Sequence, residues 1–121
     1  MPEFGKPEDL ENRTFRFAAR VRNFVRKLPR TICNIEDVQQ LVRASGSVAA
    51  NYIEADEALS DKDFVFRLKI CRKESKESRL FLKLLDTAGN AVLDNEREGL
   101  AQEARELMLI FNAIIRKKGG R

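Results

Sequence analysis

Two glutamates one helical turn apart are the side chains of this 121-residue chain whose types and spacing come nearest to a catalytic or metal-binding site. Glu74 and Glu77 lie among apolar positions of an expected helix, so at least one carboxylate should be partly buried and need a partner. The chain contains no histidine, which excludes a Ser-His-Asp triad, a Cys-His pair and the Glu-x-x-His ligands of di-iron bundles. We therefore expect no catalytic residue, no metal and no cofactor. We expect instead a structural polar network that joins these carboxylates to Arg43 or Asn51.

A polar stripe lies on the helical segment that precedes the two glutamates. Its members are spaced by three, four, four and three residues, and they are Gln40, Arg43, Ser47, Asn51 and Glu54. In a helix this spacing places all of them on one face. The stripe is either ordinary solvated surface or a contact with another subunit, because small and hydrogen-bonding residues suit a close approach of helices. The spacing alone favours neither interpretation.

Basic residues gather along two further segments. Those of the third expected helix fall within about 100° of one another on a helical wheel, and we single out Lys69, Arg72, Lys76, Arg79 and Lys83. The first expected helix adds Arg13, Arg16 and Arg20. Such lines of charge neutralise phosphates and give nucleic-acid affinity without sequence preference, but they also serve as ordinary solvating faces. Because no aromatic residues are interleaved with them, base-specific recognition is not expected.

The composition places these residues in a helical protein. All three prolines lie within the first 29 positions, so the following 92 residues contain no helix breaker, and the net charge is only +4. Cys33 and Cys71 have no metal-ligand or CxxC spacing and are expected to be reduced thiols. No apolar run approaches the roughly 20 residues of a membrane span, and residues 1–10 lack the hydrophobic core of a signal peptide. The sequence therefore predicts a cytoplasmic protein without a membrane partner.

Four amphipathic segments follow one another along the chain. The expected helices span residues 12–28, 35–59, 61–88 and 95–117. Asn34, Ser60 and Asn95 are each followed three residues later by an acid, so we expect them to cap the second, third and fourth helices, with Asn12 or Asp9 near the start of the first. Heptad seams along the last two helices predict left-handed packing. The sequence therefore predicts an all-α single domain, residues 1–121, folded as a left-handed up-down-up-down four-helix bundle.

Small residues stand in the middle of the second and third expected helices. The third has Cys71, Ser75 and Ser78 between larger seam residues, and the second has Gly46 among alanines and serines. Where the two helices are antiparallel neighbours, these residues allow their backbones to approach closely. Because glycine costs about 1 kcal/mol inside a helix, we expect Gly46 to serve this contact.

Two segments, 40–54 (QLVRASGSVAANYIE) and 68–85 (LKICRKESKESRLFLKLL), resemble the four-helix-bundle proteins of the 23S rRNA intervening-sequence family. The resemblance extends from about residue 13 to 116. Its most specific residues are Arg43, Asn51, Glu54 and Glu77. Many members have glycine directly after the Asn-x-x-Glu, whereas this chain has Ala55. The turn after the second helix is therefore expected to be built differently here.

The resemblance implies a bacterial bundle that assembles into a ring-shaped homo-oligomer, most plausibly a pentamer, and so favours the subunit-contact interpretation of the polar stripe. Bundles similar to this family bind nucleic acid through basic surfaces and serve as accessory subunits of retroelement reverse transcriptases. Several copies of a weak basic patch in one ring would also add their affinities. We therefore expect a non-enzymatic homo-oligomer that binds nucleic acid, RNA or DNA, with structured RNA favoured. The alternative is a protein-interaction scaffold, or an accessory subunit of a nucleic-acid enzyme, without direct RNA binding.

Overall fold

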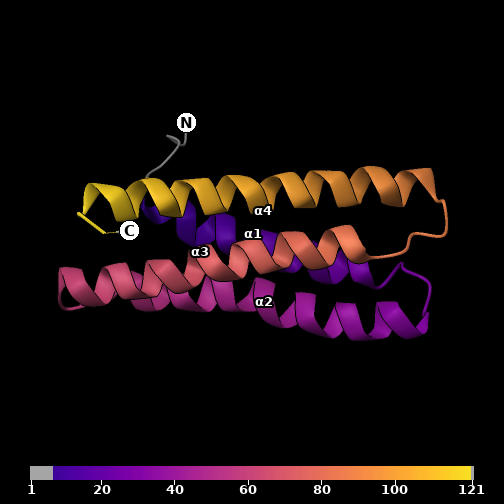
Figure 1. The fold of residues 1–121 in the computed structure, drawn as a ribbon, viewed down its shortest axis with the longest axis horizontal. Coiled ribbons are helices and arrows are strands. Elements are labelled where there is room, and N and C mark those ends of the chain that lie inside the picture. The colour runs from indigo at the N-terminus through magenta and orange to yellow at the C-terminus, as the bar shows by residue number, and fades with distance from the viewer. Residues whose placement is uncertain (1–6, 121) are drawn as a thin grey trace.

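Four helices joined by short turns make up residues 7–120, the part of the chain that this computed structural model describes, with side chains described from Leu10 onward (Figure 1). The helices are α1 Pro7–Val25, α2 Ile32–Asp56, α3 Asp61–Leu84 and α4 Ala91–Lys117. Consecutive helices are antiparallel, and contacts join α1 to α2, α2 to α3, α3 to α4 and α1 to α4, whereas α1 and α3 do not touch. The predicted all-α four-helix bundle is confirmed, and its left-handed sense stays a prediction.

The apolar seams of all four helices meet in one core. Its large, fully buried side chains are Phe17, Val21 and Phe24 of α1, Leu41 and Val48 of α2, Leu68 and Leu82 of α3, and Leu100, Leu107, Phe111 and Ile115 of α4. Residues three or four positions apart return to the same face of a helix. The heptad seams predicted for the third and fourth helices are therefore the buried faces.

Two of the predicted helix starts are wrong. The N-cap of α2 is Thr31, whose Oγ1 accepts a hydrogen bond from Asn34 N at 3.1 Å, and the N-cap of α4 is Asn90, whose Oδ1 accepts from Val92 N and Leu93 N at 3.0 and 3.1 Å. The acids three residues after Asn34 and Asn95 suggested capping boxes at those two residues. Thr31 and Asn90 cap a helix equally well and come earlier in the chain, and they are the N-caps of the structure. Ser60, in contrast, caps α3 as predicted.

Four other helix boundaries also differ from the prediction, whereas the start of α3 at Asp61 and the end of α4 at Lys117 are confirmed. α1 begins at Pro7 rather than near residue 12, because the first turn of a helix tolerates a residue without an N–H. α1 and α2 end at Val25 and Asp56, three residues before the predicted ends at 28 and 59. α3 ends at Leu84 rather than at residue 88, because Leu85 is extended and Ala88 and Gly89 adopt left-handed φ values of 55° and 74°. Those two residues form the turn that reverses the chain into α4.

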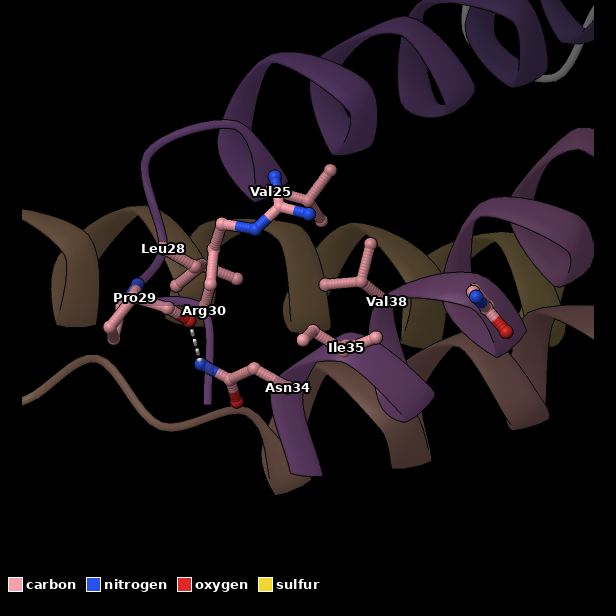
Figure 2. Close-up of a pocket in the computed structure, with 8 residues that line it drawn as sticks. Val25, Leu28, Pro29, Arg30, Asn34, Ile35 and Val38 are labelled. Carbon is pink, nitrogen blue, oxygen red and sulfur yellow. Dashed lines mark hydrogen bonds between the residues drawn. The ribbon is translucent and has the colours of Figure 1, made fainter. Parts of the chain in front are cut away.

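Asn34 joins two turns at the same end of the bundle. Its Nδ2 donates to the carbonyl oxygens of Pro29 and Asp86, both at 2.9 Å, and its Oδ1 accepts from Asp86 N at 2.9 Å. Figure 2 shows the first of these bonds, beside the pocket that lies next to Asn34. Asn34 is therefore a buried clamp between the α1–α2 turn and the α3–α4 connection, and this clamp also aligns the start of α2 with the end of α3.

The middle of α3 packs closely against α2 at Cys71, as predicted. Cys71, Ser75 and Ser78 are all fully buried, and the Cys71 thiol lies 3.5 Å from the carbonyl oxygen of Val48. Burial raises the pKa of Cys71 to about 12, so the thiol is neutral and acts as a small core side chain. Gly46 does not take part in this contact. A Cβ at Gly46 would lie 3.1 Å from Nη2 of Arg22, so the glycine makes room for a side chain of α1 instead.

Replacing Asn34 by alanine should lower the free energy of unfolding by about 2–3 kcal/mol, because it deprives the Asp86 N–H and two carbonyls of their partner. Thr31→Ala, which removes only the N-cap, should cost about 1 kcal/mol. Urea unfolding followed by circular dichroism measures both changes at one protein concentration. Equal losses for the two variants would contradict the clamping role of Asn34.

Candidate nucleic-acid interface

Glu74 and Glu77 of α3 share one arginine. Arg43 of α2 donates from Nη1 to Glu74 Oε2 at 3.1 Å and from Nη2 to Glu77 Oε2 at 3.3 Å, so the guanidinium bridges both carboxylates of α3. Glu74 is buried, and Glu77 is half-buried at the surface. Each carboxylate accepts a hydrogen bond from the Arg43 guanidinium, which stays protonated. This arrangement stabilises the ionised carboxylates and does not transfer a proton.

The same seam between α2 and α3 contains further hydrogen bonds. Asn51 donates from Nδ2 to both the side-chain and the main-chain oxygen of Ser47 at 3.0 Å, and its Oδ1 accepts from Arg67 Nη1 at 3.1 Å. We call the six residues the α2–α3 network: Arg43, Ser47, Asn51, Arg67, Glu74 and Glu77. Arg67 was not among the predicted site residues, although it stands seven residues before Glu74 and therefore on the same face of the helix.

The other two members of the predicted polar stripe lie outside this network. Gln40 and Glu54 are exposed, and neither makes a side-chain hydrogen bond to another residue of the described chain. The α2–α3 network is therefore continuous only over the central turns of the two helices, where their small residues bring them together.

The electrostatic state of Glu74 follows from these contacts. Burial acts to raise its pKa, but hydrogen bonds from Arg43, together with those to Glu77 and Ser47, outweigh this effect and hold the pKa of Glu74 below its ordinary value of 4.5. Glu74 is therefore ionised at neutral pH. An ionised carboxylate bound to arginine is a poor general acid, which agrees with a structural role.

The basic residues of α1 and α3 form two separate groups. Because α1 and α3 do not touch and both pack on α4, the bundle does not merge their charges into one surface. Arg16 and Arg20 are exposed on α1. Arg13 is different, because its Nε and Nη2 donate to the two carboxylate oxygens of Glu103 at 2.8 and 2.9 Å, and Nη2 also donates to Glu106 at 3.0 Å.

Arg13 therefore belongs to the packing of α1 on α4. Its hydrogen bonds to Glu103 raise the pKa of the guanidinium, against burial, which acts to lower it. Lys27 similarly pairs with Glu96 at 2.7 Å. Glu96, Glu103 and Glu106 of α4 thus neutralise two cations of α1, whereas Arg20, whose guanidinium lies beside Gly99 on the same seam, has no carboxylate partner in the described chain.

The opposite side of α4 is basic. Lys76, Arg79 and Lys83 of α3 and Arg105 of α4 line a groove of about 280 Å³ together with small and apolar residues, and we call these four the α3–α4 basic groove. No member of the groove makes an ion pair with any residue of the described chain. Glu98 lies in a neighbouring hollow that Arg79 and Lys83 also line. Arg105 was not among the predicted site residues, because residues 94–106 are net acidic and only the packing of α4 on α3 brings this arginine to the basic residues of α3.

Two other predicted cations extend the basic side of α3. Arg72 donates from Nη1 to Asn112 Oδ1 of α4 at 2.8 Å, and since an amide carries no charge, this bond leaves the charge of Arg72 unneutralised. Lys69 is exposed one turn before it. The sequence-predicted ridge of α3 is therefore present as a continuous edge beside α4.

Two further properties bear on the kind of site this is. Among the described residues, no group of three or more potential metal ligands of the Cys, Asp and Glu types comes together. No helix within residues 7–120 is both long enough and apolar enough to cross a membrane.

These observations define the class of protein as an all-helical bundle with a polar seam between α2 and α3 and a basic groove between α3 and α4. Residues 9–113 match the family of 23S rRNA-intervening sequence proteins, and the chain belongs to that family. Its fold is similar to that of a protein of unknown function from the S23 ribosomal protein family of Bacteroides thetaiotaomicron, with a TM-score of 0.75, 24% identity, and 91% of this chain and 97% of the other covered. No curated protein matches the sequence.

Glu74→Gln should reduce the dependence of stability on acidic pH. Because the folded-state pKa of Glu74 lies below its unfolded value, its ionisation stabilises the fold above pH 4.5, and this contribution is lost as the pH falls through the folded pKa. Thermal unfolding between pH 7 and pH 3 at constant ionic strength measures the effect. Arg43→Gln, which removes the main hydrogen-bond donor but leaves Glu74 buried, should raise the pKa of Glu74 and lower the stability more at pH 7 than at pH 3. An acid dependence of Glu74→Gln identical to that of the wild type would contradict this assignment.

Arg13→Ala should lower the free energy of unfolding by about 1–3 kcal/mol, because it leaves the half-buried Glu103 carboxylate without its bidentate partner. Arg16→Ala is the matched control, since Arg16 is exposed on the same helix, and this change should stay within about 0.5 kcal/mol of the wild type. Denaturant unfolding compares the three proteins. Equal stability of the two variants would show that Arg13 contributes nothing to the packing of α1 on α4.

Proposed function

We propose that this protein is a non-enzymatic cytoplasmic homo-oligomer that binds structured RNA through the α3–α4 basic groove. The observation that carries the proposal is the difference in charge compensation between the two sides of α4. Arg13 and Lys27 on the α1 side are paired with carboxylates, whereas Lys76, Arg79, Lys83 and Arg105 have no such partner in the described chain. Unpaired cations along one edge attract phosphates without paying the cost of breaking an existing ion pair.

The groove has the chemistry of a phosphate-binding surface. Lys76, Arg79 and Lys83 are spaced by three and four residues, so they follow one edge of α3 over about 10 Å. Arg105 reaches the groove from α4, and Lys69 and Arg72 lengthen the edge towards the start of α3. No aromatic ring lines the groove, so bases would have nothing to stack on. Recognition of the backbone of a folded or double-helical RNA fits this surface better than recognition of unpaired bases.

Self-association would strengthen binding by one groove. A ring of identical subunits, a pentamer on the family resemblance, presents several copies of the groove to a single RNA, and linked sites bind more tightly than each alone. The α2–α3 network is our candidate for a subunit contact, because its outer residues are polar and its helices closely packed. The names of both related families also refer to ribosomal components, 23S rRNA and a ribosomal protein, which supports RNA over DNA as the ligand.

A protein-interaction scaffold is the second candidate function. Val92 and Leu109 of α4 are apolar and exposed, as a surface for another protein would require. In this case the basic groove would only keep the assembly soluble, and the protein would act as an accessory subunit of a nucleic-acid enzyme such as a reverse transcriptase. Binding of RNA by the purified protein separates the two functions.

The triple variant Lys76→Ala, Arg79→Ala, Lys83→Ala should bind a labelled RNA hairpin more weakly, and its logarithmic affinity should fall less steeply with salt. Each lost phosphate contact reduces the slope against logarithmic salt concentration by about 1, so the expected reduction is about 2–3. Fluorescence anisotropy at several salt concentrations measures the slope, and a DNA duplex of the same sequence tests the preference for RNA.

The matched control is Arg26→Ala, Arg116→Ala, Lys117→Ala, which removes the same charge from exposed positions outside the groove. This variant should retain nearly the wild-type slope. Equal losses in both triple variants would show that only net charge matters, and no binding by the wild type at low salt would exclude the proposed function in favour of the scaffold.

A further inference from the structure

Three cations of α1 face α4 along one seam, and the middle one is left without a carboxylate. Arg13, Arg20 and Lys27 are spaced by seven residues, so they share one face of α1. Arg13 bonds to Glu103 and Lys27 to Glu96, and these two glutamates are likewise seven residues apart on α4. Arg20 makes no ion pair within the described chain, so its charge is available to an anion from outside the molecule.

Gly99 lies opposite Arg20 on the exposed surface of α4. The Arg20 Nη2 lies 3.8 Å from the place where a Cβ of residue 99 would stand, an ordinary van der Waals distance, so the packing has room for a methyl group. Gly99 stands within the helix and not at a turn, and its φ is not positive. Glycine destabilises the interior of a helix. Because neither the backbone conformation nor the packing requires this glycine, it suits the close approach of a ligand to the helix backbone.

Gly99 also borders a hollow of about 510 Å³ on the outer face of α4. Arg79 and Lys83 line it from α3, and three polar residues line it from α4, namely Asn95, Glu98 and Gln102. Because α1 and α3 do not touch each other and both pack on α4, Arg20 and the two cations of α3 reach this face from opposite flanks of the helix. An α-helix with its side chains is about 10–12 Å across. Two lines of positive charge are therefore separated by about the width of one helix.

The carboxylates of this surface leave both flanks positive. On the α1 side, the three glutamates of α4 that face the seam are already bound by Arg13 and Lys27, and Arg16 adds a second exposed cation one turn before Arg20. On the outer face itself, Glu98 makes no ion pair within the described chain and lies beside the two cations of α3. Unpaired negative charge therefore stands in the middle of the face, and positive charge is in excess on either side of it.

We infer that the outer face of α4 between residues 95 and 102 lies in the minor groove of an A-form RNA duplex, with Arg20 on the phosphates of one strand and Arg79 and Lys83 on those of the other. The minor groove of an RNA helix is wide and shallow, whereas that of B-DNA is only about 6 Å wide and too narrow for an α-helix. Gly99 lets the backbone of α4 approach the floor of the groove. The inference rests on the proposed RNA binding and specifies double-helical RNA as the ligand.

Hydrogen-bonding groups on the same face favour ribose over deoxyribose. The RNA minor groove displays 2′-hydroxyls, which donate hydrogen bonds. The Glu98 carboxylate accepts such bonds but repels phosphate, so a carboxylate in the middle of the face fits the riboses, whereas the flanking cations fit the phosphates. Gln102 donates from Nε2 to Glu106 at 3.2 Å, which leaves its side-chain oxygen as a further acceptor. Asn95 is exposed one turn before Glu98 and supplies another.

The first test changes residues on α4 and α1 and measures binding of a fluorescent RNA duplex by anisotropy. Gly99→Gln should weaken binding by about 10-fold, the equivalent of one or two lost hydrogen bonds. Glutamine favours a helix more than glycine does, so the urea midpoint of this variant should be equal or higher. Arg20→Ala should reduce the slope of logarithmic affinity against logarithmic salt concentration by about 1. Arg26→Ala is its matched control, because Arg26 is exposed on α1 and bonds only to Asn23 of the same helix within the described chain.

The second test changes the sugar of the duplex. An RNA duplex with 2′-O-methyl riboses keeps the A-form and the phosphates but has no hydroxyl donor, so the wild type should bind it about 2- to 10-fold more weakly. Glu98→Ala should reduce this preference for unmodified RNA. Glu57→Ala, which removes the same charge from an exposed position at the end of α2, should retain it.

Three results would each overturn the inference: Gly99→Gln and Arg20→Ala proteins that bind like the wild type, equal affinity for the two RNA duplexes, and equal affinity for a DNA duplex, whose major groove also admits a helix. In each case, RNA binding that the Lys76→Ala, Arg79→Ala, Lys83→Ala variant still weakens leaves the proposed function standing. A wild type that binds no RNA at low salt excludes both.

Discussion

The close antiparallel packing of α2 on α3 is the constraint on which the rest of the molecule depends. Cys71 is small enough to bring α3 against the backbone of α2 at Val48, and the register of the two helices places Arg43 between two carboxylates. A larger side chain at Cys71 would separate the two helices and disrupt the polar network between them.

Helix α4 divides the charge of the molecule. Glu96, Glu103 and Glu106 face α1 and neutralise Arg13 and Lys27. On the side that packs on α3, four cations are unpaired within the described chain, and Glu98 lies beside two of them. A net charge of +4 over 121 residues is small, but the fold concentrates positive charge in one groove by cancelling it elsewhere. This separation explains how a weakly basic chain can present a surface suited to phosphate without a strongly basic composition.

Much of the architecture could be predicted from local patterns. The four helices, the heptad seams and the cap at Ser60 all follow from spacings of three, four or seven residues, which a helix converts directly into shared faces. The spacing left Arg43 and Asn51 as alternative partners of Glu74, and the packing of α2 on α3 selects Arg43. The starts of α2 and α4 could not be predicted in the same way. Thr31 competes with Asn34 as the N-cap of α2, and Asn90 competes with Asn95 as the N-cap of α4. At the start of α2, the Asn34 side chain bonds to Asp86 instead of capping the helix, a contact that only the fold creates.

The sequence by itself determined the helical class, the absence of histidine chemistry and the family to which the chain belongs, because composition and periodicity are properties of the chain alone. Only the tertiary structure decided which charges remain unpaired. Arg13 and Arg79 both belong to basic runs in the sequence, yet one is bound by Glu103 and the other lines an open groove. Partners 90 residues apart along the chain are selected by the packing of helices, and no local pattern records that choice.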